Sequence, residues 1–531
     1  MRAIAGNRAA LDQFYYLKNF ETVLDSLRER YADLLSAEEH GFMERFRAMP
    51  QASRALLVRM VMRKGELFRA SALRYAEIGA THAVAAPLAQ AGWVDVEPHL
   101  TLEELQALLT KAELVRHFAL PGRELQRKKS DLAALLRQQY SQAKPFLDWC
   151  PGSGERVYRL TVAALCERFR LMFFGNFRQD WSAFVLADLG IFSFEKIDLA
   201  VQSRAFRSRE DVDVLLQLQR CREYLNSTTP LDTVVRSVPE EVRDCDWLEE
   251  RRQKLLFDVA RALERSGDTL AACAIYSRCT HSGAHERGVR LYRREQRKLG
   301  IRCAATPRAT RNPPELPSFE LVLDQPVPGC AIEYLARNHL AQDMPHGATV
   351  HYVENSLINS LFGLLCWRAI FAPIAGAFFH DFHRGPADLS SADFYRRRER
   401  EFAGCFAELE SGRYQMTIRE TYTRKVGIQS PFVAWNLLSE SLLAHALACL
   451  PPEHLRHWFE WIARDVPRNR AGFPDLIQLW PRERRYRMIE VKAPGDRLQD
   501  NQRRLLQFCA GHGMPVAVCY VRWARPNVAQ S

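Results

Sequence analysis

The end of the chain contains a strand–strand–helix–strand order, and this order constrains the fold more than any other feature of the sequence. Two apolar segments, residues 475–480 and 486–491, predict strands joined by a polar turn. A helix is predicted over residues 496–510, where nearby glycines end it, and residues 514–521 predict a third strand. We therefore expect the C-terminal region to fold as an α/β domain.

Two acids and a lysine lie at neighbouring ends of the first two predicted strands. Asp475 follows Pro474, and Glu490 and Lys492 are two residues apart, so both of their side chains point to one face of the strand. We expect these carboxylates to hold one or two Mg²⁺ or Mn²⁺ ions, with the carbonyl of Val491 as a further ligand. Such a metal lowers the pKa of water and neutralises charge on a phosphodiester under attack. Lys492 is expected to orient or deprotonate that water, or to stabilise the transition state.

Two more polar residues fall on apolar faces of predicted helices. Glu354 is expected to open a helix over residues 353–365 and, from the spacing of the leucines that follow it, to point into the core. A metal ion is one partner for an inward carboxylate, and an arginine is the other. Gln502 lies on the apolar face of the predicted C-terminal helix. Its amide is expected either to hydrogen-bond water at the metal or to cap a polar group in the core.

The chain before residue 300 is predicted to be helical. Apolar residues recur at helical spacing through residues 10–95, and residues 98–140 predict a helix–loop–helix that resembles a SAP module, a small DNA-binding unit. Thr101 and Glu104 have the spacing of a capping box at its start. Three basic residues before its second helix are candidates for holding a phosphate: Arg127, Lys128 and Lys129. A plain helical hairpin with a solvated basic loop is the alternative.

Further along, residues 255–276 pair two amphipathic helices across Gly267 and resemble a single tetratricopeptide unit, for which we expect a scaffold role. A proline-rich segment over residues 301–318 predicts a domain boundary, because prolines at this density interrupt helices and strands. We therefore expect four domains: an N-terminal helical domain (1–95), a SAP-like module (96–140), a helical, tetratricopeptide-like domain (141–305) and a C-terminal catalytic domain (306–531).

The C-terminal pattern resembles a known nuclease domain. Residues 472–476, 489–494 and 496–498, together with Gln502, resemble the VRR-NUC domain, a branch of the PD-(D/E)xK nucleases. The chain as a whole resembles the Fanconi anaemia-associated nuclease family. Other segments match that family in the same order: residues 62–69, the SAP-like hairpin, residues 174–191, the tetratricopeptide-like unit and residues 376–386.

This resemblance implies a structure-specific DNA endonuclease that cuts 5′ flaps, has 5′→3′ exonuclease activity and unhooks interstrand crosslinks with Mg²⁺ or Mn²⁺. Asp475, Glu490 and Lys492 fall on the catalytic triplet of the family, and Glu354 falls on its helical metal-binding glutamate. Vertebrate members also carry a ubiquitin-binding zinc finger. Because no cysteine precedes Cys150, we expect no such finger, and the architecture is similar to that of a bacterial member.

The composition is that of a globular protein with a basic surplus. Its hydrophobic fraction of 47% excludes wholesale disorder, and 74 Lys and Arg against 63 Asp and Glu give a net charge of +11. Such a charge favours a polyanion partner or an anionic surface. Much of the excess lies within residues 464–525. Candidates for contacting DNA phosphates are Arg424, Lys425, Arg468, Arg470 and Arg497, each with a solvated surface role as the alternative.

Several alternatives remain open at this point. A Holliday-junction resolvase, a non-catalytic scaffold for branched DNA and a helical protein-interaction array compete with the flap nuclease. We expect a monomer, with a dimer as the alternative. Residues 357–379 are apolar but contain Arg368 and Pro373, so we expect a core helix there and no membrane association. Scattered single cysteines predict reduced thiols, and we expect a cytoplasmic location at the bacterial nucleoid, with no signal peptide.

Overall fold

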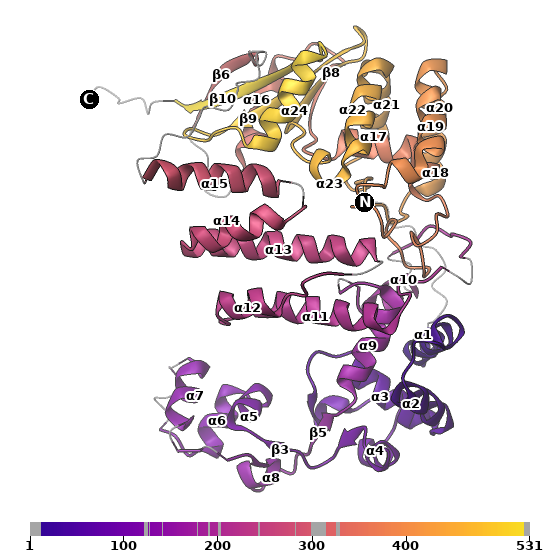
Figure 1. Ribbon diagram of the computed structural model, residues 1–531, viewed down its shortest axis with the longest axis vertical. Coiled ribbons are helices and arrows are strands. Elements are labelled where there is room, and N and C mark those ends of the chain that lie inside the picture. The colour runs from indigo at the N-terminus through magenta and orange to yellow at the C-terminus, as the bar shows by residue number, and fades with distance from the viewer. Residues whose placement is uncertain are drawn as a thin grey trace. The chain divides into compact units, whose positions relative to one another are not determined.

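The computed structural model divides into two compact units (Figure 1). The first comprises Met1–Phe192 and Arg204–Val212, and the second comprises Ser193–Ser203 and Asp213–Ser531. The residues that the structure describes are 12–121, 126, 128–137, 139–140, 142–177, 179–188, 192–199, 203–242, 245–281, 283–298, 315–324 and 330–524.

The first unit is built mainly of helices around an aromatic core. The helical elements outside the SAP region are α1 (Tyr15–Tyr31), α2 (Ala37–Ala48), α3 (Gln51–Val61), η1 (Ala70–Leu73), α4 (Thr81–Gln90), α9 (Ala163–Phe174) and α10 (Ser182–Asp188). Leu17, Phe20 and Leu27 of α1 are buried, as their helical spacing predicts. A small antiparallel sheet has the order β1 (Leu67–Arg69), β5 (Val157–Leu160), β2 (Val94–Asp95).

Residues 98–140 contain three helices where two were expected, and the SAP region continues beyond them. Its elements are β3 (His99–Leu100), α5 (Leu102–Leu108), α6 (Lys111–His117), α7 (Lys129–Arg137), β4 (Lys144–Pro145) and α8 (Phe146–Trp149). The capping box of Thr101 and Glu104 is confirmed, with reciprocal hydrogen bonds of 2.9 and 3.2 Å. A second capping box, formed by Thr110 and Glu113, starts α6. This box divides the first predicted helix, because its hydrogen bonds favour a new helix start at that point.

The predicted pair of amphipathic helices is confirmed in the second unit. The helices of this region are α11 (Arg209–Leu225), α12 (Leu231–Ser237), α13 (Asp246–Ser266), α14 (Thr269–Arg278) and α15 (Ala284–Lys298). Gly267 takes a φ of 91° and ends α13. Asp268 then caps α14 by accepting the N–H of Ala271 at 3.1 Å. The predicted boundary over residues 301–318 lies mostly outside the described residues.

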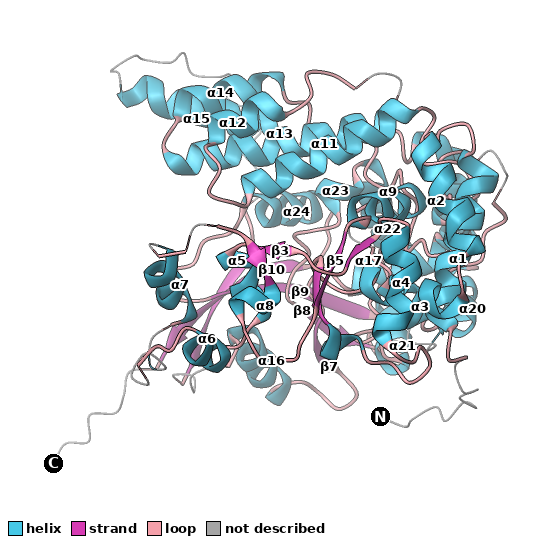
Figure 2. Cartoon of the chain, turned by 90° about the horizontal axis from the view of Figure 1, so that it is seen from below, coloured by secondary structure: helices cyan, strands magenta, loops and turns pink. Residues whose placement is uncertain are grey.

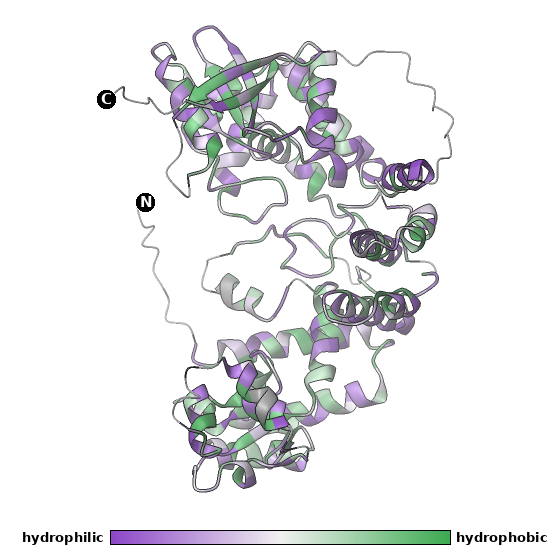
Figure 3. Ribbon diagram, turned by 90° about the vertical axis from the view of Figure 1, so that its left-hand side faces the viewer, coloured by the Kyte–Doolittle hydropathy of each residue, from purple (hydrophilic) through white to green (hydrophobic). Residues whose placement is uncertain are grey.

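A five-stranded mixed sheet forms the centre of the C-terminal region (Figure 2). Its order is β6 (Ser318–Leu323), β10 (Val516–Trp523), β9 (Arg485–Lys492), β8 (Leu476–Trp480) and β7 (Thr349–Tyr352). β10 pairs parallel with β6 and β9, whereas β8 pairs antiparallel with β9 and β7. All five residues of β8 are buried, and the central strands are largely hydrophobic (Figure 3). The strand–strand–helix–strand prediction is confirmed, with α24 (Asp500–Gly511) between β9 and β10.

Helices pack around this sheet and, together with its strands, bury a large hydrophobic core. They include α16 (Ile332–Gln342), α17 (Leu357–Leu365), α18 (Trp367–Ile370), η3 (Arg396–Arg398), α19 (Glu399–Ser411), α20 (Tyr414–Lys425), α21 (Glu440–Cys449), α22 (Pro452–Arg464) and α23 (Val466–Asn469). The single core helix expected over residues 357–379 is wrong. Pro373 lacks an N–H and clashes with the preceding helical turn, so α18 ends before it. No helix within the described part of the chain is both long and apolar enough to cross a membrane.

The mostly helical N-terminal two-thirds and the C-terminal α/β region are thus as expected. The domain boundaries at residues 95, 140 and 305 stay predictions. The twelve cysteines that the structure describes are all free, and most of them are buried.

Candidate active site

The register of the central strands places Asp475 beside Glu490. β8 and β9 are antiparallel, with Leu476 opposite Ile489, and one further step along the same register sets Asp475 opposite Glu490. The backbone N–H of Val491 donates to Oδ2 of Asp475 at 2.8 Å, which fixes the aspartate side chain against β9. The sheet therefore brings together the two acids that the sequence pattern singled out.

Asp475, Glu490 and Lys492 are all buried, with exposed fractions of 6%, 0% and 8%. The Lys492 ammonium forms an ion pair with Oε1 of Glu490 at 2.7 Å, and within the described residues no other donor contacts either glutamate oxygen. A charge buried in this way is costly unless a cation or hydrogen-bond donors compensate it. One lysine faces two carboxylates here, so this part of the site retains excess negative charge.

The protonation of the two acids reflects this crowding. Burial raises the pKa of Asp475 to about 6, and the nearby charge of Glu354 adds to the rise, while the Val491 N–H opposes it. Burial likewise raises the pKa of Glu490 to about 7, helped by the charge of Asp475 and opposed by Lys492. Perturbed carboxyl groups of this kind are typical of functional sites.

Glu354 reaches the same site by a different route from the one expected. It lies in the turn between β7 and α17, which begins only at Leu357, and it is exposed, so the inward helical position predicted for it is wrong. Asn355 has a φ of 49° and accepts the Phe473 N–H at 2.9 Å, and this turn delays the helix. The Tyr352 hydroxyl donates to Glu354 at 2.5 Å. The charge of Glu354 still raises the pKa values of both Asp475 and Glu490.

Gln502 has a structural partner. Its side-chain oxygen accepts the backbone N–H of Gln499 at 2.9 Å, and the two residues form a capping box at the start of α24. Of the two roles left open by the sequence, the observed contact matches neither a core cap nor a bond to water at a metal. A catalytic role for Gln502 stays a prediction.

The loop before Asp475 depends on Gly472. This glycine has a φ of +96°, and a Cβ at this position would lie 2.9 Å from the carbonyl of Asn501 and 3.2 Å from the nitrogen of Gln502. The start of α24 therefore packs directly against the backbone that leads to Asp475. A residue with a side chain here would be strained for two reasons: its backbone would have to keep the positive φ, and its Cβ would clash with the start of α24.

We expect Gly472→Ala to lower the free energy of unfolding by about 1–3 kcal/mol. We also expect slower DNA cleavage, because the strain is transmitted to the loop that carries Asp475. Urea unfolding followed by circular dichroism measures the first effect. Gly511→Ala is the matched control, since no atom lies within 4 Å of its Cβ position and its φ is not in the left-handed region. Equal stabilities of the two variants would contradict the close packing at Gly472.

The candidate DNA-binding residues of the catalytic region fall into two groups. Lys425 and Arg468 already have partners, Glu195 and Glu286, each at 2.6 Å. The remaining candidates are exposed: Arg424, Arg470 and Arg497. In the SAP region, Lys128 is exposed at the start of α7, Lys129 donates to the carbonyl of Leu109 at 2.7 Å, and Arg127 lies outside the described residues.

Arg470 lines a pocket of about 360 Å³ whose wall includes Asn355, the residue after Glu354. Its guanidinium lies over the Phe432 ring, 5.9 Å from the centroid, and forms no ion pair within the described part of the chain. Asn359 holds the wall of the pocket by donating to the carbonyls of Asn355 and Arg470 at 2.7 and 2.8 Å. Asn355, Asn359 and Phe432 were not among the residues predicted from the sequence. Two asparagines four residues apart, directly after Glu354 in an otherwise apolar segment, were the available signal.

The acids fit a hard divalent cation in their chemistry. Two buried carboxylates with raised pKa values, and Glu490 oxygens that within the described residues only Lys492 contacts, provide the oxygen ligands that such ions prefer. Among the described residues, no group of three or more His, Cys, Asp or Glu side chains is arranged to hold a metal. The Glu354 carboxylate instead accepts the hydrogen bond from the Tyr352 hydroxyl.

A mixed sheet with an aspartate before one strand and a Glu-x-Lys sequence on the next defines the class of PD-(D/E)xK nucleases. Three family profiles match the chain: "FAN1, HTH domain" over residues 14–95, "Fanconi anemia-associated nuclease SAP domain" over residues 99–149 and "VRR-NUC domain" over residues 409–523. Both Asp475 and the Glu490–Lys492 pair lie within the VRR-NUC match, whereas Glu354 precedes it.

Similar proteins support the same assignment. The Fanconi-associated nuclease 1 homolog of Pseudomonas aeruginosa is 48% identical over 97% of each chain, and the homolog of Oryza sativa is 24% identical over 97% of this chain and 63% of its own. The crystal structure of paFAN1 bound to 5′-flap DNA with a 2-nucleotide flap and a gap superimposes with a TM-score of 0.91, at 48% identity, covering 98% of this chain and all of that one. The chain belongs to the Fanconi-associated nuclease 1 family and is a metal-dependent DNA nuclease.

Proposed function

We propose that this protein is a structure-specific endonuclease that cuts 5′ flaps and also degrades DNA in the 5′→3′ direction. Its role would lie in DNA repair, including the repair of interstrand crosslinks. The buried Asp475–Glu490–Lys492 cluster carries the proposal, because it combines carboxylate oxygens suited to a metal with an ammonium group where the neighbouring strands β8 and β9 meet. The similarity to a nuclease that was crystallised with 5′-flap DNA supports the choice of substrate.

In this proposal, Asp475 and Glu490 hold Mg²⁺ or Mn²⁺ with the carbonyl of Val491, and one or two ions are compatible with the chemistry. The cation supplies positive charge to the phosphate and lowers the pKa of water. Glu354 would join as a ligand by exchanging its hydrogen bond from Tyr352. Lys492, placed by its contact with Glu490, would orient the attacking water and stabilise charge on the phosphate. A further role for Gln502 would require its capping bond to break.

DNA would be held by the basic residues around this site and in the SAP region. Arg470 and Arg497 are the best placed, because both are exposed and Arg470 has no carboxylate partner within the described part of the chain. Lys425 and Arg468 would have to exchange ion pairs to contact a phosphate. Arg424 and the basic segment of Arg127, Lys128 and Lys129 complete the proposed contacts.

An end-labelled panel of 5′-flap, nicked, forked and four-way DNA tests the proposed substrate. With Mg²⁺ or Mn²⁺, we expect the flap to be cut in preference to the other substrates, and the labelled products to show degradation from the 5′ end. Symmetrical cutting of the four-way junction with the flap left intact would instead indicate a resolvase. Tight flap binding with no cleavage would indicate a scaffold.

The raised pKa values predict how metal and pH affect stability. The folded protein holds protons on Asp475 (pKa about 6) and Glu490 (pKa about 7) more tightly than the unfolded chain does, whose carboxyls titrate near pH 4. Stability from these groups is therefore greatest below about pH 4, and it falls as the pH rises through about 6–7, where both become charged. A bound cation offsets this cost only once the carboxylates are ionised.

We therefore expect Mn²⁺ to raise the melting temperature at about pH 8 and to have little effect at about pH 5. Thermal unfolding at both values, with Mn²⁺ or with EDTA, measures the difference. Asp475→Asn is the control, because it removes one buried charge and one metal ligand. Its metal-free form should melt higher than the wild type at about pH 8 and gain less from Mn²⁺. An equal gain in both proteins would place the metal elsewhere.

A further inference from the structure

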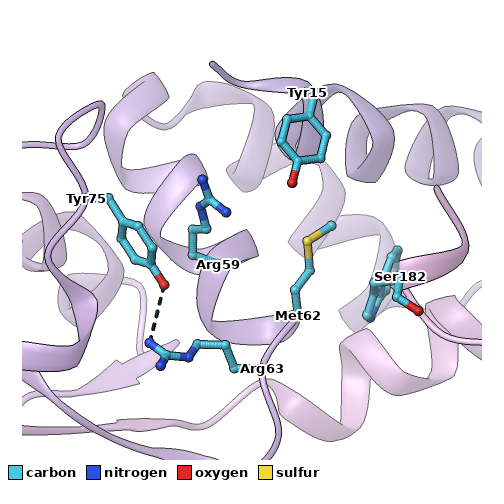
Figure 4. A pocket seen from close by; sticks show the side chains of 7 residues that line it. Tyr15, Arg59, Met62, Arg63, Tyr75 and Ser182 are labelled. Atoms are coloured by element: carbon cyan, nitrogen blue, oxygen red, sulfur yellow. Dashed lines mark hydrogen bonds between the residues drawn. The ribbon is translucent and has the colours of Figure 1, made fainter. Parts of the chain in front are cut away.

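The first unit contains a pocket that the nuclease chemistry does not use. Its volume is about 390 Å³, within the range of pockets that hold small ligands. Helices α1 and α3, the segment after η1 and the start of α10 form its walls, and Figure 4 shows these side chains around a common space. The lining residues are Tyr15, Arg59, Met62, Arg63, Tyr75, Trp181 and Ser182.

Two arginines of α3 and its C-terminal end line this pocket, but they differ in their partners. Arg59 is part of the wall: it pairs with Glu77 at 2.6 Å and lies over the Tyr16 and Tyr75 rings, 3.8 and 4.7 Å from their centroids. Arg63 is exposed, and it donates hydrogen bonds to neutral oxygens, the carbonyl of Ala72 at 2.5 Å and the Tyr75 hydroxyl at 3.3 Å. Within the described residues, Arg63 therefore has no carboxylate to balance its charge.

Aromatic side chains supply the rest of the lining. Tyr15 and Tyr75 are half-buried and stand on opposite sides of Arg59 in Figure 4. Trp181, which also lines the pocket, is buried. Aromatic rings next to the Arg63 guanidinium, which has no carboxylate partner within the described residues, suit a ligand that contains both an aromatic ring and an anionic group. A nucleotide has this chemistry, since its base stacks on aromatic rings and its phosphate pairs with arginine.

We propose that this pocket binds one nucleotide of an unpaired DNA strand, with the base against the tyrosine rings and the phosphate at Arg63. The proposal rests on the proposed function only in that DNA is the substrate. It adds a further non-catalytic DNA site to those around the active site and in the SAP region. A free nucleotide shares the same chemistry. Two observations favour a DNA strand over a free nucleotide. The pocket, except for its wall at α10, lies within the region matched by the HTH profile. Lys64, next to Arg63, is also exposed and can contact a neighbouring phosphate of the strand.

The test compares DNA with and without an unpaired strand, in EDTA so that nothing is cut. Fluorescence anisotropy measures the affinity of the full-length protein for a duplex with a thymidine flap and for the same duplex without it. We expect the double variant Arg63→Ala/Tyr15→Ala to reduce the preference for the flapped DNA about tenfold. Arg63→Lys with Tyr15→Phe should recover most of it, because a cation and a ring remain. Arg28→Ala, an exposed arginine of α1 outside the pocket, should leave it unchanged.

Photo-cross-linking locates the contact directly. A flap that carries 5-iododeoxyuridine is expected to cross-link to Tyr15 or Tyr75 in the wild type, and the Arg63→Ala variant should lose most of this product. Cross-links that form only outside the pocket would overturn the proposal. An unchanged preference for flapped DNA in the double alanine variant would also overturn it. Displacement of the strand by thymidine monophosphate at an equal nucleotide concentration would overturn the assignment to DNA. Melting temperatures verify that each variant is folded.

Cleavage of the flap with Mn²⁺ separates this proposal from the nuclease assignment. Arg28→Ala, which lies outside both the pocket and the catalytic site, should cut the flap at the wild-type rate. A wild-type protein that cuts nothing would refute the proposed function. The flap preference in EDTA would still test the pocket.

Discussion

Replacing Asp475 with asparagine is expected to slow cleavage of a 5′-flap duplex at least about 10³-fold, while its affinity for that DNA stays close to the wild-type value. Asparagine keeps an oxygen that can accept the Val491 N–H, so the loop should keep its position. It removes the charge that pairs with Glu490 to attract a divalent cation. The loss should therefore fall on the chemical step and on metal binding, and not on folding.

Single-turnover cleavage over a range of Mn²⁺ concentrations measures this effect, and anisotropy in EDTA measures DNA binding. Asp500→Asn is the matched control, because Asp500 is an exposed aspartate at the start of α24 whose partner is Arg290 at 3.2 Å. It should cut at nearly the wild-type rate. Undiminished cleavage by Asp475→Asn would remove this residue from the active site.

Lys492→Ala is expected to slow the same reaction by about 10²–10⁴-fold with a different signature. The two carboxylates remain, so the Mn²⁺ concentration that gives half of the maximal rate should change little. The maximal rate should fall, because the ammonium that lies 2.7 Å from Glu490 no longer orients water or balances charge. Lys492→Arg keeps the charge but changes its shape, and we expect only partial recovery.

Rapid-quench kinetics at saturating metal separate these two effects. Arg487→Ala, on the same strand β9 but outside the cluster, is the control for a general weakening of the sheet. If Lys492→Ala requires much more Mn²⁺ and reaches the wild-type rate, then Lys492 serves the metal site and not the chemical step.

The parts of the fold that follow local patterns were predictable from sequence. β8, β9, α24 and β10 appeared in the right order, because each has its own hydrophobic period and a turn signal at its ends. The outer strands β6 and β7 were not predicted. β7 has only four residues, all half-buried, and its pairing with β8 supplies the order that its own sequence does not specify.

The candidate site shows the same division. Asp475, Glu490 and Lys492 were brought together by the antiparallel register, which a strand pair with a short turn makes nearly inevitable. The predicted position of Glu354 was wrong because Asn355 takes a left-handed conformation and accepts the Phe473 N–H. The helix therefore begins only at Leu357. The ion pairs of Lys425 with Glu195 and of Arg468 with Glu286 join residues more than 180 positions apart, and no local pattern specifies such partners.

Diffraction from crystals grown with Mn²⁺ tests the central claim most directly, because the anomalous signal locates the metal without reference to activity. A peak is expected about 2.1 Å from carboxylate oxygens of both Asp475 and Glu490 and close to the carbonyl of Val491, and it should be absent in Asp475→Asn crystals. A peak elsewhere, or none at these residues under conditions in which the protein cuts DNA, would contradict the assignment of the active site.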